Sequence, residues 1–430
     1  MKSKRVLLVQ PKISENSENV YSYGWSPPLG LLSIATYINN KDQSLEVKIL
    51  DESVEEINSL EADILGLSCN LLNYSRALEI AKRFKEKNTE GKVVIGGPHA
   101  ILGENILRNK EYIDAVVYGF DGEEAFYQYI TGYPKETISN LIWRKGNEII
   151  KNNEEFLDLN RLPAPDRHFL ELEKYFKNFK DPSFKKPTTI YTTKGCSHAK
   201  CSFCMLSGLK HIVRNRRFER VWEEVSYLQE NYGIDYIWNV SDNLPAELFS
   251  LLLKTKPKGV NCAFRFYVRS KEINEETAEI LSQLNTYEVF IGVESGNNEI
   301  LKGMNKGETV EDHIEAVKIL SKYKIKPRIA FVLGAEGETE ETLQQTYKFA
   351  EYLLDIGADS IACSVFTPVP GSRAFYKLLE KEGKYQSLDL IDVEELQENW
   401  IKNFTSVDLT TVKQYIDKFK KMSANWGKVF

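Results

Sequence analysis

The chain of 430 residues is long enough for two or three domains, each with its own hydrophobic core. Its 56 basic and 62 acidic side chains give a net charge of −6, which offers no reason to expect a nucleic-acid binder. No apolar stretch approaches the roughly 20 residues that cross a bilayer. The apolar run at residues 6–9 is also too short for the core of a signal peptide. We therefore expect a cytoplasmic protein with neither nucleic acid nor membrane as a partner.

The first part of the chain alternates short apolar strands with amphipathic helices. Helical patterns run over residues 29–39 and 75–87. Such alternation predicts a parallel sheet with helices on both faces, because each crossover between parallel strands needs a helix. We expect a doubly wound, Rossmann-like domain over residues 1–135. Its predicted strands are residues 5–9, 47–50, 64–67, 93–95 and 115–117.

The loops after these strands carry the first group of candidate binding residues. Ligands of doubly wound sheets lie at the carboxyl ends of the strands. Gly96-Gly97-Pro98 would let the backbone approach a flat ligand closely, although a plain tight turn is the alternative. Several such loops at one sheet edge favour a large ligand. The candidates are Pro28, Leu29, Gly30, Ser68, Asn73, Gly96, Gly97, Pro98, His99, Gly119 and Glu123.

A second alternation follows a less regular stretch. Residues 136–186 contain Leu162-Pro-Ala-Pro165, a sequence typical of a linker. Residues 187–378 then hold six strand–helix repeats, which predict a partial, TIM-like (β/α)6 barrel with its active site at the carboxyl ends of the strands. We expect residues 379–430 to form a helical appendage. The predicted barrel strands are residues 188–193, 236–240, 262–268, 289–293, 328–333 and 360–366.

Three cysteines lie within nine residues, directly after the first strand of this predicted barrel. The sequence reads Cys196-Ser-His-Ala-Lys-Cys201-Ser-Phe-Cys204. Three thiolates on one loop favour a four-iron cluster, in which the iron without a protein ligand is open to chemistry. A zinc site that adds His198 as fourth ligand is the alternative. His198 is poorly placed for it, only two residues from Cys196.

The triplet and the six repeats resemble radical S-adenosylmethionine (SAM) enzymes, and the first domain resembles the cobalamin-binding domain of one large subgroup. The resemblance covers residues 4–380 and includes further motifs along the barrel. One departure concerns the cluster loop: four residues separate Cys196 from Cys201, where the family has three. The motifs are Gly292-Val-Glu-Ser-Gly296, Met304-Asn-Lys-Gly307, Phe331-Val-Leu-Gly-Ala-Glu-Gly-Glu-Thr-Glu340 and Thr367-Pro-Val-Pro-Gly371.

The resemblance implies a 4Fe-4S cluster on Cys196, Cys201 and Cys204, with SAM bound at the open iron and cleaved to a 5′-deoxyadenosyl radical. Phe203 would pack on the adenine, with a core aromatic as the alternative. Asp242 would face the methionine ammonium, with a helix N-cap as the alternative. The remaining candidates for SAM are Arg265 or Arg269 at the carboxylate, Glu294 at the ribose and Gly334 at the adenine.

The resemblance also implies cobalamin as a cofactor of the first domain. The Asp-x-His-x-x-Gly pattern that supplies a histidine to cobalt in other cobalamin proteins is absent, since Asp51 is followed by Glu52 and Ser53. The lower face of the cobalt would then have no histidine from the protein. Tyr21, Tyr23 or Trp25 would approach it instead.

The leading hypothesis is a cobalamin-dependent methyltransferase that acts on an unactivated carbon of a small molecule or peptide natural product. Cyclisation, ring contraction or rearrangement by the same domain pair is the alternative, and a zinc-stabilised binding protein is a third. No further cysteine cluster exists, so we expect electrons from a separate donor of the flavodoxin or ferredoxin type. The substrate, the oligomeric state and any catalytic residue stay open.

Overall fold

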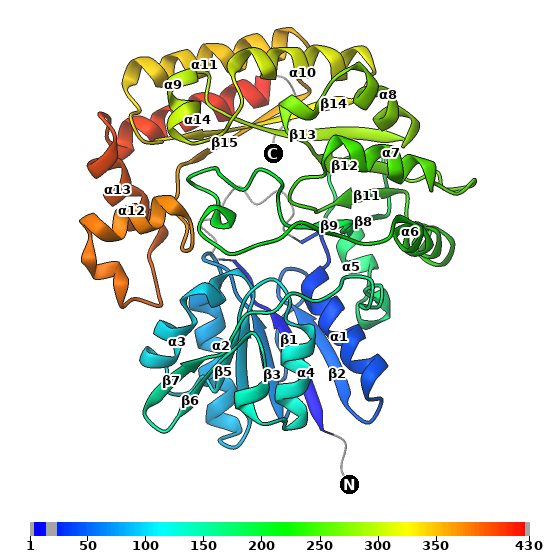
Figure 1. Cartoon of the computed structure of the whole chain (residues 1–430), viewed down its shortest axis with the longest axis vertical. Helices are drawn as coiled ribbons and strands as arrows, with labels where there is room; N and C mark the ends of the chain where they lie inside the picture. The colour runs from blue at the N-terminus through cyan, green and yellow to red at the C-terminus, as the bar shows by residue number, and fades with distance from the viewer. Residues whose placement is uncertain (1–3, 14–23, 426–430) are drawn as a thin grey trace. The chain divides into compact units, whose positions relative to one another are not determined.

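A computed structural model describes residues 4–13 and 24–425. The described chain forms two compact units. Unit 1 comprises the residues up to Pro182 together with Lys384–Ile391, and unit 2 comprises Ser183–Gly383 and the residues from Asp392. The chain therefore returns to unit 1 for a short segment after the barrel, a path that the sequence did not suggest. Figure 1 shows both units.

Unit 1 is built on a seven-stranded sheet in the order β2-β1-β3-β4-β5-β6-β7. Strands β1 to β5 run parallel, as the alternation of strands and helices predicts, whereas β6 and β7 are antiparallel. The last two strands lie in the stretch that we expected to be a linker. The strands are β1 (Arg5–Gln10), β2 (Glu46–Asp51), β3 (Ile64–Ser68), β4 (Lys92–Gly96), β5 (Ala115–Val117), β6 (Leu141–Lys145) and β7 (Glu148–Lys151).

Helices cover both faces of this sheet because successive strand residues point to opposite sides. In β1, Leu7 and Val9 face one core and Val6 and Leu8 face the other. Helices α2 and α3 bury their apolar residues in the first core, and α1 and α4 bury theirs in the second (Figure 1). The helices are α1 (Leu29–Lys41), α2 (Tyr74–Lys87), α3 (Gly103–Asn109), α4 (Glu123–Thr131) and α5 (Glu173–Phe176), with the short 3₁₀ helix η1 (Pro98–Leu102).

Unit 2 is a partial barrel of six parallel strands in the order β15-β14-β13-β12-β11-β8. Each strand pairs with its neighbours in sequence order, so the carboxyl ends of all six meet at one edge. The six repeats predicted from the sequence are confirmed. The strands are β8 (Pro187–Ile190), β11 (Tyr236–Asn239), β12 (Ala263–Tyr267), β13 (Thr286–Glu294), β14 (Lys326–Leu333) and β15 (Ser360–Val365).

Several helices of unit 2 begin at a residue whose side chain caps them. Thr309 and Thr339 each close a capping box, which satisfies backbone donors at the starts of α10 and α11. A two-stranded ladder of β9 (Thr193–Lys194) and β10 (Arg214–Asn215) brackets the cysteine loop. The helices are α6 (Phe218–Tyr232), α7 (Ala246–Lys254), α8 (Glu275–Gln283), α9 (Asn298–Gly303), α10 (Val310–Lys322), α11 (Glu340–Asp355), α12 (Arg373–Lys381), α13 (Val393–Phe404) and α14 (Leu409–Asn425).

The C-terminal helices are packed into the barrel wall. Trp400 of α13 stacks on Phe366 with ring centroids 4.7 Å apart, and Phe419 of α14 lies 5.3 Å from Phe331 of β14. Burying such aromatic rings contributes roughly 1.5–3 kcal/mol each, so these helices are part of the fold. Within the described residues, no helix has the length and apolar character needed to cross a membrane.

Candidate functional site: a cysteine loop at the carboxyl edge of the barrel

The three cysteines lie on the loop that follows β8, where the barrel strands end. All three are free thiols and partly exposed. Burial raises the pKa of Cys201 to about 11 and also raises the pKa of Cys204; negative charge on Cys204 adds to the first rise and negative charge on Cys196 adds to the second. Metal binding would have to displace the protons of these thiols. Among the described residues the three side chains do not form an assembled metal-binding group, but three thiols on one loop are the donor set of a cluster held by three thiolates.

The extra residue between Cys196 and Cys201 is absorbed by a local change of backbone conformation. Ala199 adopts φ 41°, in the left-handed region, and its N–H points to the Cys196 sulfur at 3.5 Å. The preceding side chain, His198, donates from Nε2 to the Asn305 carbonyl at 2.7 Å. The zinc alternative required this imidazole as fourth ligand, and here its Nε2 is engaged by backbone instead.

Neighbouring segments hold the cysteine loop at several further points. The Gly195 N–H donates to Asp242 Oδ2 at 2.9 Å, and Asn243 Nδ2 donates to Ser197 Oγ at 3.2 Å. In the second half of the loop, the Ser202 N–H donates to the Met304 carbonyl at 2.8 Å. The loop is thus tied to the segments that follow β11 and α9.

Asp242 lies beside the start of the cysteine loop, where it accepts from the Gly195 N–H. Its carboxylate is exposed, yet the surrounding protein desolvates it enough to raise its pKa. The N-cap alternative does not apply, because α7 begins at Ala246 with Pro245 as its cap. Phe203, the candidate for the adenine, is half-buried, and its ring centre lies 6.2 Å from that of Phe366.

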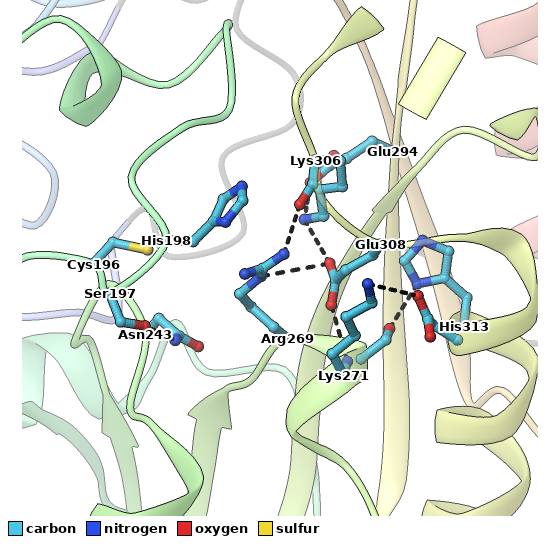
Figure 2. A network of polar contacts seen from close by, with 12 residues as sticks. Cys196, Ser197, His198, Asn243, Arg269, Lys271, Glu294, Lys306, Glu308 and His313 are labelled. Carbon is cyan, nitrogen blue, oxygen red and sulfur yellow. Dashed lines mark hydrogen bonds and ion pairs between the residues drawn. The ribbon is translucent and has the colours of Figure 1, made fainter. Parts of the chain in front are cut away.

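A network of buried charges adjoins the loop (Figure 2). Glu294 ends β13 with φ 65°, and its Oε1 accepts from Lys306 Nζ at 3.0 Å. Lys306 also lies 3.5 Å from Glu308 Oε2, and the same oxygen lies 3.7 Å from Arg269 Nε. Arg269 Nη2 donates to the Lys306 carbonyl at 2.6 Å. Sequence reasoning missed Lys306 and Glu308, although Lys306 stands inside a motif that was recognised.

The two arginines proposed for the SAM carboxylate are separated. Arg269 belongs to the network of Figure 2. Arg265 lies inside the barrel, with its guanidinium 4.6 Å from the Trp238 ring and 5.1 Å from the Phe290 ring. It pairs with Glu288, six residues before Glu294 on β13, so it lies deeper than the strand ends. Arg269 is the better placed of the two.

Gly334 follows β14 with φ 92°, a conformation that disfavours any side chain. Its carbonyl accepts from Trp400 Nε1 at 3.1 Å, and a Cβ here would lie 3.2 Å from Ile401. The glycine therefore lets α13 approach the strand end. This reason for a glycine was not anticipated and leaves the adenine role as a proposal.

The candidates of unit 1 gather at the carboxyl edge of its sheet. Gly30 is the second residue of α1, and no atom lies within 4 Å of the position of a Cβ there. Trp25 is buried, with its ring centre 4.7 Å from that of Phe179. Tyr21 and Tyr23 lie outside the described residues. The other candidates at this edge are Pro28 and Leu29 at α1, Ser68 at the end of β3, Gly96, Gly97 and Pro98 after β4, and Gly119 after β5.

Three of the expected cobalamin contacts serve the interior of unit 1 instead. His99 is 2% exposed, stacks on Tyr74 at 4.0 Å and bonds through Nε2 to the Asp389 carbonyl at 2.7 Å. Burial lowers the pKa of His99 to about 4, which keeps the ring neutral. Asn73 donates to the carbonyls of Pro11 and Ser68, each at 3.2 Å. Glu123, the third, is buried, and its Oε1 accepts from Ser33 Oγ at 2.7 Å.

Two family models match the chain. The radical SAM superfamily model matches residues 190–350, and the B12 binding domain model matches residues 20–130. The chain is similar to an uncharacterized methyltransferase of Pyrococcus horikoshii, 28% identical over 87% of this chain and 83% of that protein. It is also similar to the anaerobic magnesium-protoporphyrin IX monomethyl ester cyclase of Rubrivivax gelatinosus, 26% identical over 77% of this chain and 61% of that protein.

Solved structures show the same fold. The cobalamin-dependent radical enzyme OxsB, with aqua-cobalamin bound, matches with a TM-score of 0.74 at 17% identity, over 99% of this chain and 67% of its own. The radical methyltransferase TsrM of Kitasatospora setae, with cobalamin and a [4Fe-4S] cluster bound, matches with a TM-score of 0.68 at 17% identity, over 88% of this chain and 78% of its own.

The B12 binding domain model matches residues of the first sheet and its helices. The radical SAM model matches residues of the barrel and includes the cysteine loop. The cofactors expected from the sequence, a 4Fe-4S cluster, SAM and cobalamin, are those of the matched domains. The chain therefore carries a B12-binding domain followed by a radical SAM domain, and it shares its fold with solved cobalamin-dependent radical SAM enzymes.

Proposed function

We propose that the chain transfers a methyl group from SAM, by way of cobalamin, to an unactivated carbon of a small molecule or peptide natural product. When bound, the cluster supplies the electron that cleaves SAM and cobalamin carries the methyl group. The names of the Pyrococcus relative and of TsrM, both methyltransferases, support this reaction. Electrons would come from a separate donor of the flavodoxin or ferredoxin type.

The observation that carries the proposal concerns the histidines of unit 1. There are two, and neither stands ready to bind cobalt: His99 is buried against Asp389, and His168 pairs with Asp166 at 2.6 Å. Asp51, at the place where other cobalamin proteins begin their histidine motif, accepts from Tyr175 and Ser53 instead. A cobalamin bound to unit 1 would receive no imidazole from these two histidines, an environment that would suit a cobalt that gains and loses a methyl group.

The residues of the barrel edge divide the binding of SAM among them. Asp242 would accept from the methionine ammonium, and Arg269 would pair with the methionine carboxylate. Glu294 offers the ribose hydroxyls its Oε2, which accepts no hydrogen bond from a described residue, while Lys306 occupies Oε1. Phe203 and the backbone at Gly334 would border the adenine.

A second candidate is radical cyclisation or rearrangement, which the similarity to the magnesium-protoporphyrin cyclase favours. Methyl transfer and radical cyclisation can be distinguished by an incubation with methyl-labelled SAM. The full chain, loaded with cluster and cobalamin, is mixed with this SAM and a strong reductant. Methyl transfer predicts label on the cobalamin before any substrate is added. Formation of 5′-deoxyadenosine with no label on the cobalamin would favour the second candidate.

A further inference from the structure

The turn after α9 is held by the cysteine loop from two sides. The Ser202 N–H donates to the Met304 carbonyl at 2.8 Å, and His198 donates to the Asn305 carbonyl at 2.7 Å. At the end of the turn, Gly307 has φ 68°, and a Cβ there would lie 2.8 Å from His198 Cε1. The cysteine loop therefore packs directly on residues 304–307, and the longer spacing between Cys196 and Cys201 provides one of its two anchors.

This turn carries a buried cation. Lys306 is 7% exposed and pairs with Glu294 at 3.0 Å and Glu308 at 3.5 Å (Figure 2). Burial by itself lowers the pKa of Lys306, but the two carboxylates raise it by more, so the ammonium stays charged. Buried charges are screened by solvent much less than exposed ones, so this charge acts on its surroundings at short range.

The turn that carries Lys306 touches the segment between two of the cysteines. The N–H of Ser202, which lies between Cys201 and Cys204, donates to the carbonyl of Met304, two residues before Lys306. A cluster held by this loop would therefore lie in the field of the buried charges. Reduction of a cluster adds negative charge, which a nearby cation stabilises and a nearby carboxylate destabilises.

We propose that Lys306 raises the reduction potential of the cluster held by the cysteine loop, and that Glu294 counteracts it. The two residues form one ion pair next to the cysteine loop, so their opposite charges act in opposite directions on how readily the cluster accepts the electron that cleaves SAM. The inference rests on the cluster alone, and it stands whether the enzyme methylates or rearranges its substrate.

The test compares three variants of the full chain, loaded with cluster and measured without SAM. K306M removes the cation, E294Q removes the opposing charge, and K302M removes a lysine of α9 that is 81% exposed and pairs with Glu299 at 3.9 Å. Redox titration followed by electron paramagnetic resonance gives the ratio of reduced to oxidised cluster. We expect K306M to lower this ratio about tenfold at a given potential, which is about 59 mV for one electron. E294Q should raise the ratio, and K302M should leave it within about twofold of the native value.

Opposite shifts from the two members of one ion pair are a result that loosened packing would not produce. K306R should return the potential to near the native value, because it keeps the charge. Shifts of K306M and E294Q in the same direction, or no shift in either, would overturn the proposal. If K306M assembles no cluster, E294Q decides alone: a higher potential supports the role of the pair, and an unchanged potential contradicts it.

Discussion

Replacing Gly97 by alanine is expected to destabilise the sheet edge of unit 1. Gly97 has φ 85°, and a Cβ there would lie 2.6 Å from the Cys69 carbonyl oxygen and 2.9 Å from the Cys69 nitrogen. The ψ of −176° at Gly97 completes a conformation that essentially only glycine adopts, which costs another residue roughly 1–3 kcal/mol. Cys69 has little freedom to yield, because its N–H donates to the Gly96 carbonyl at 2.8 Å and its carbonyl accepts from the His99 N–H at 3.0 Å. Weakening two such bonds costs about 1 kcal/mol each, so the total is at least about 3 kcal/mol.

Hydrogen exchange of the full chain without cofactors measures this loss locally. We expect peptides that cover β3 and β4 to exchange about a hundredfold faster in G97A, since each 1.4 kcal/mol is a factor of ten. Peptides from β13 and β14 provide the internal reference. G30A is the matched control: its Cβ meets no atom within 4 Å, so exchange should be unchanged or slower. Exchange of β3 and β4 in G97A within about threefold of the native chain would refute the reasoning.

Two further predictions concern unit 2. C201A should lose most of its bound iron and its brown absorbance. C262A is the control and should keep both, because Cys262 is a buried thiol bonded to the Ile234 carbonyl. Equal iron content in the two variants would show that Cys201 is not a cluster ligand. Burial raises the pKa of Glu338 from 4.5 to about 7, so the unfolded chain releases this proton first as pH rises. The free energy of unfolding should therefore fall by up to about 3 kcal/mol between pH 4.5 and 7. E338Q should flatten that part of the melting-temperature profile, and an unchanged slope would contradict the assignment.

The sequence predicted the features that depend on local patterns. Both sets of strands, the six repeats and the place of the cysteine loop follow from apolar periodicity and from three cysteines at short spacing. The β6–β7 hairpin was missed although it had a local signal. Gly146-Asn147 lies between two short strands, a two-residue turn of the kind that joins antiparallel strands, but the linker prolines nearby received more weight.

Local sequence patterns could not predict the partners of the buried polar side chains, because segments distant in the sequence supply these partners. Burial keeps His99 neutral, and its buried ring bonds to the carbonyl of Asp389, 290 positions later. The Gly334 carbonyl accepts from Trp400 of α13, and no sequence motif predicts that this C-terminal helix packs there. Lys306 stands in a recognised motif, but only the packing of its turn against β13 brings it to Glu294. Burial and pairing of charges depend on tertiary contacts, which a motif does not describe.

The most direct test of the account is the metal and cofactor content of the full chain, purified without oxygen and supplied with iron, sulfide and cobalamin. We predict about four irons per chain, an equal amount of labile sulfide and one cobalamin, with a paramagnetic signal of the reduced cluster that changes when SAM is added. The change would show that SAM reaches the open iron. One zinc per chain, or four irons with no response to SAM and no bound cobalamin, would contradict the account.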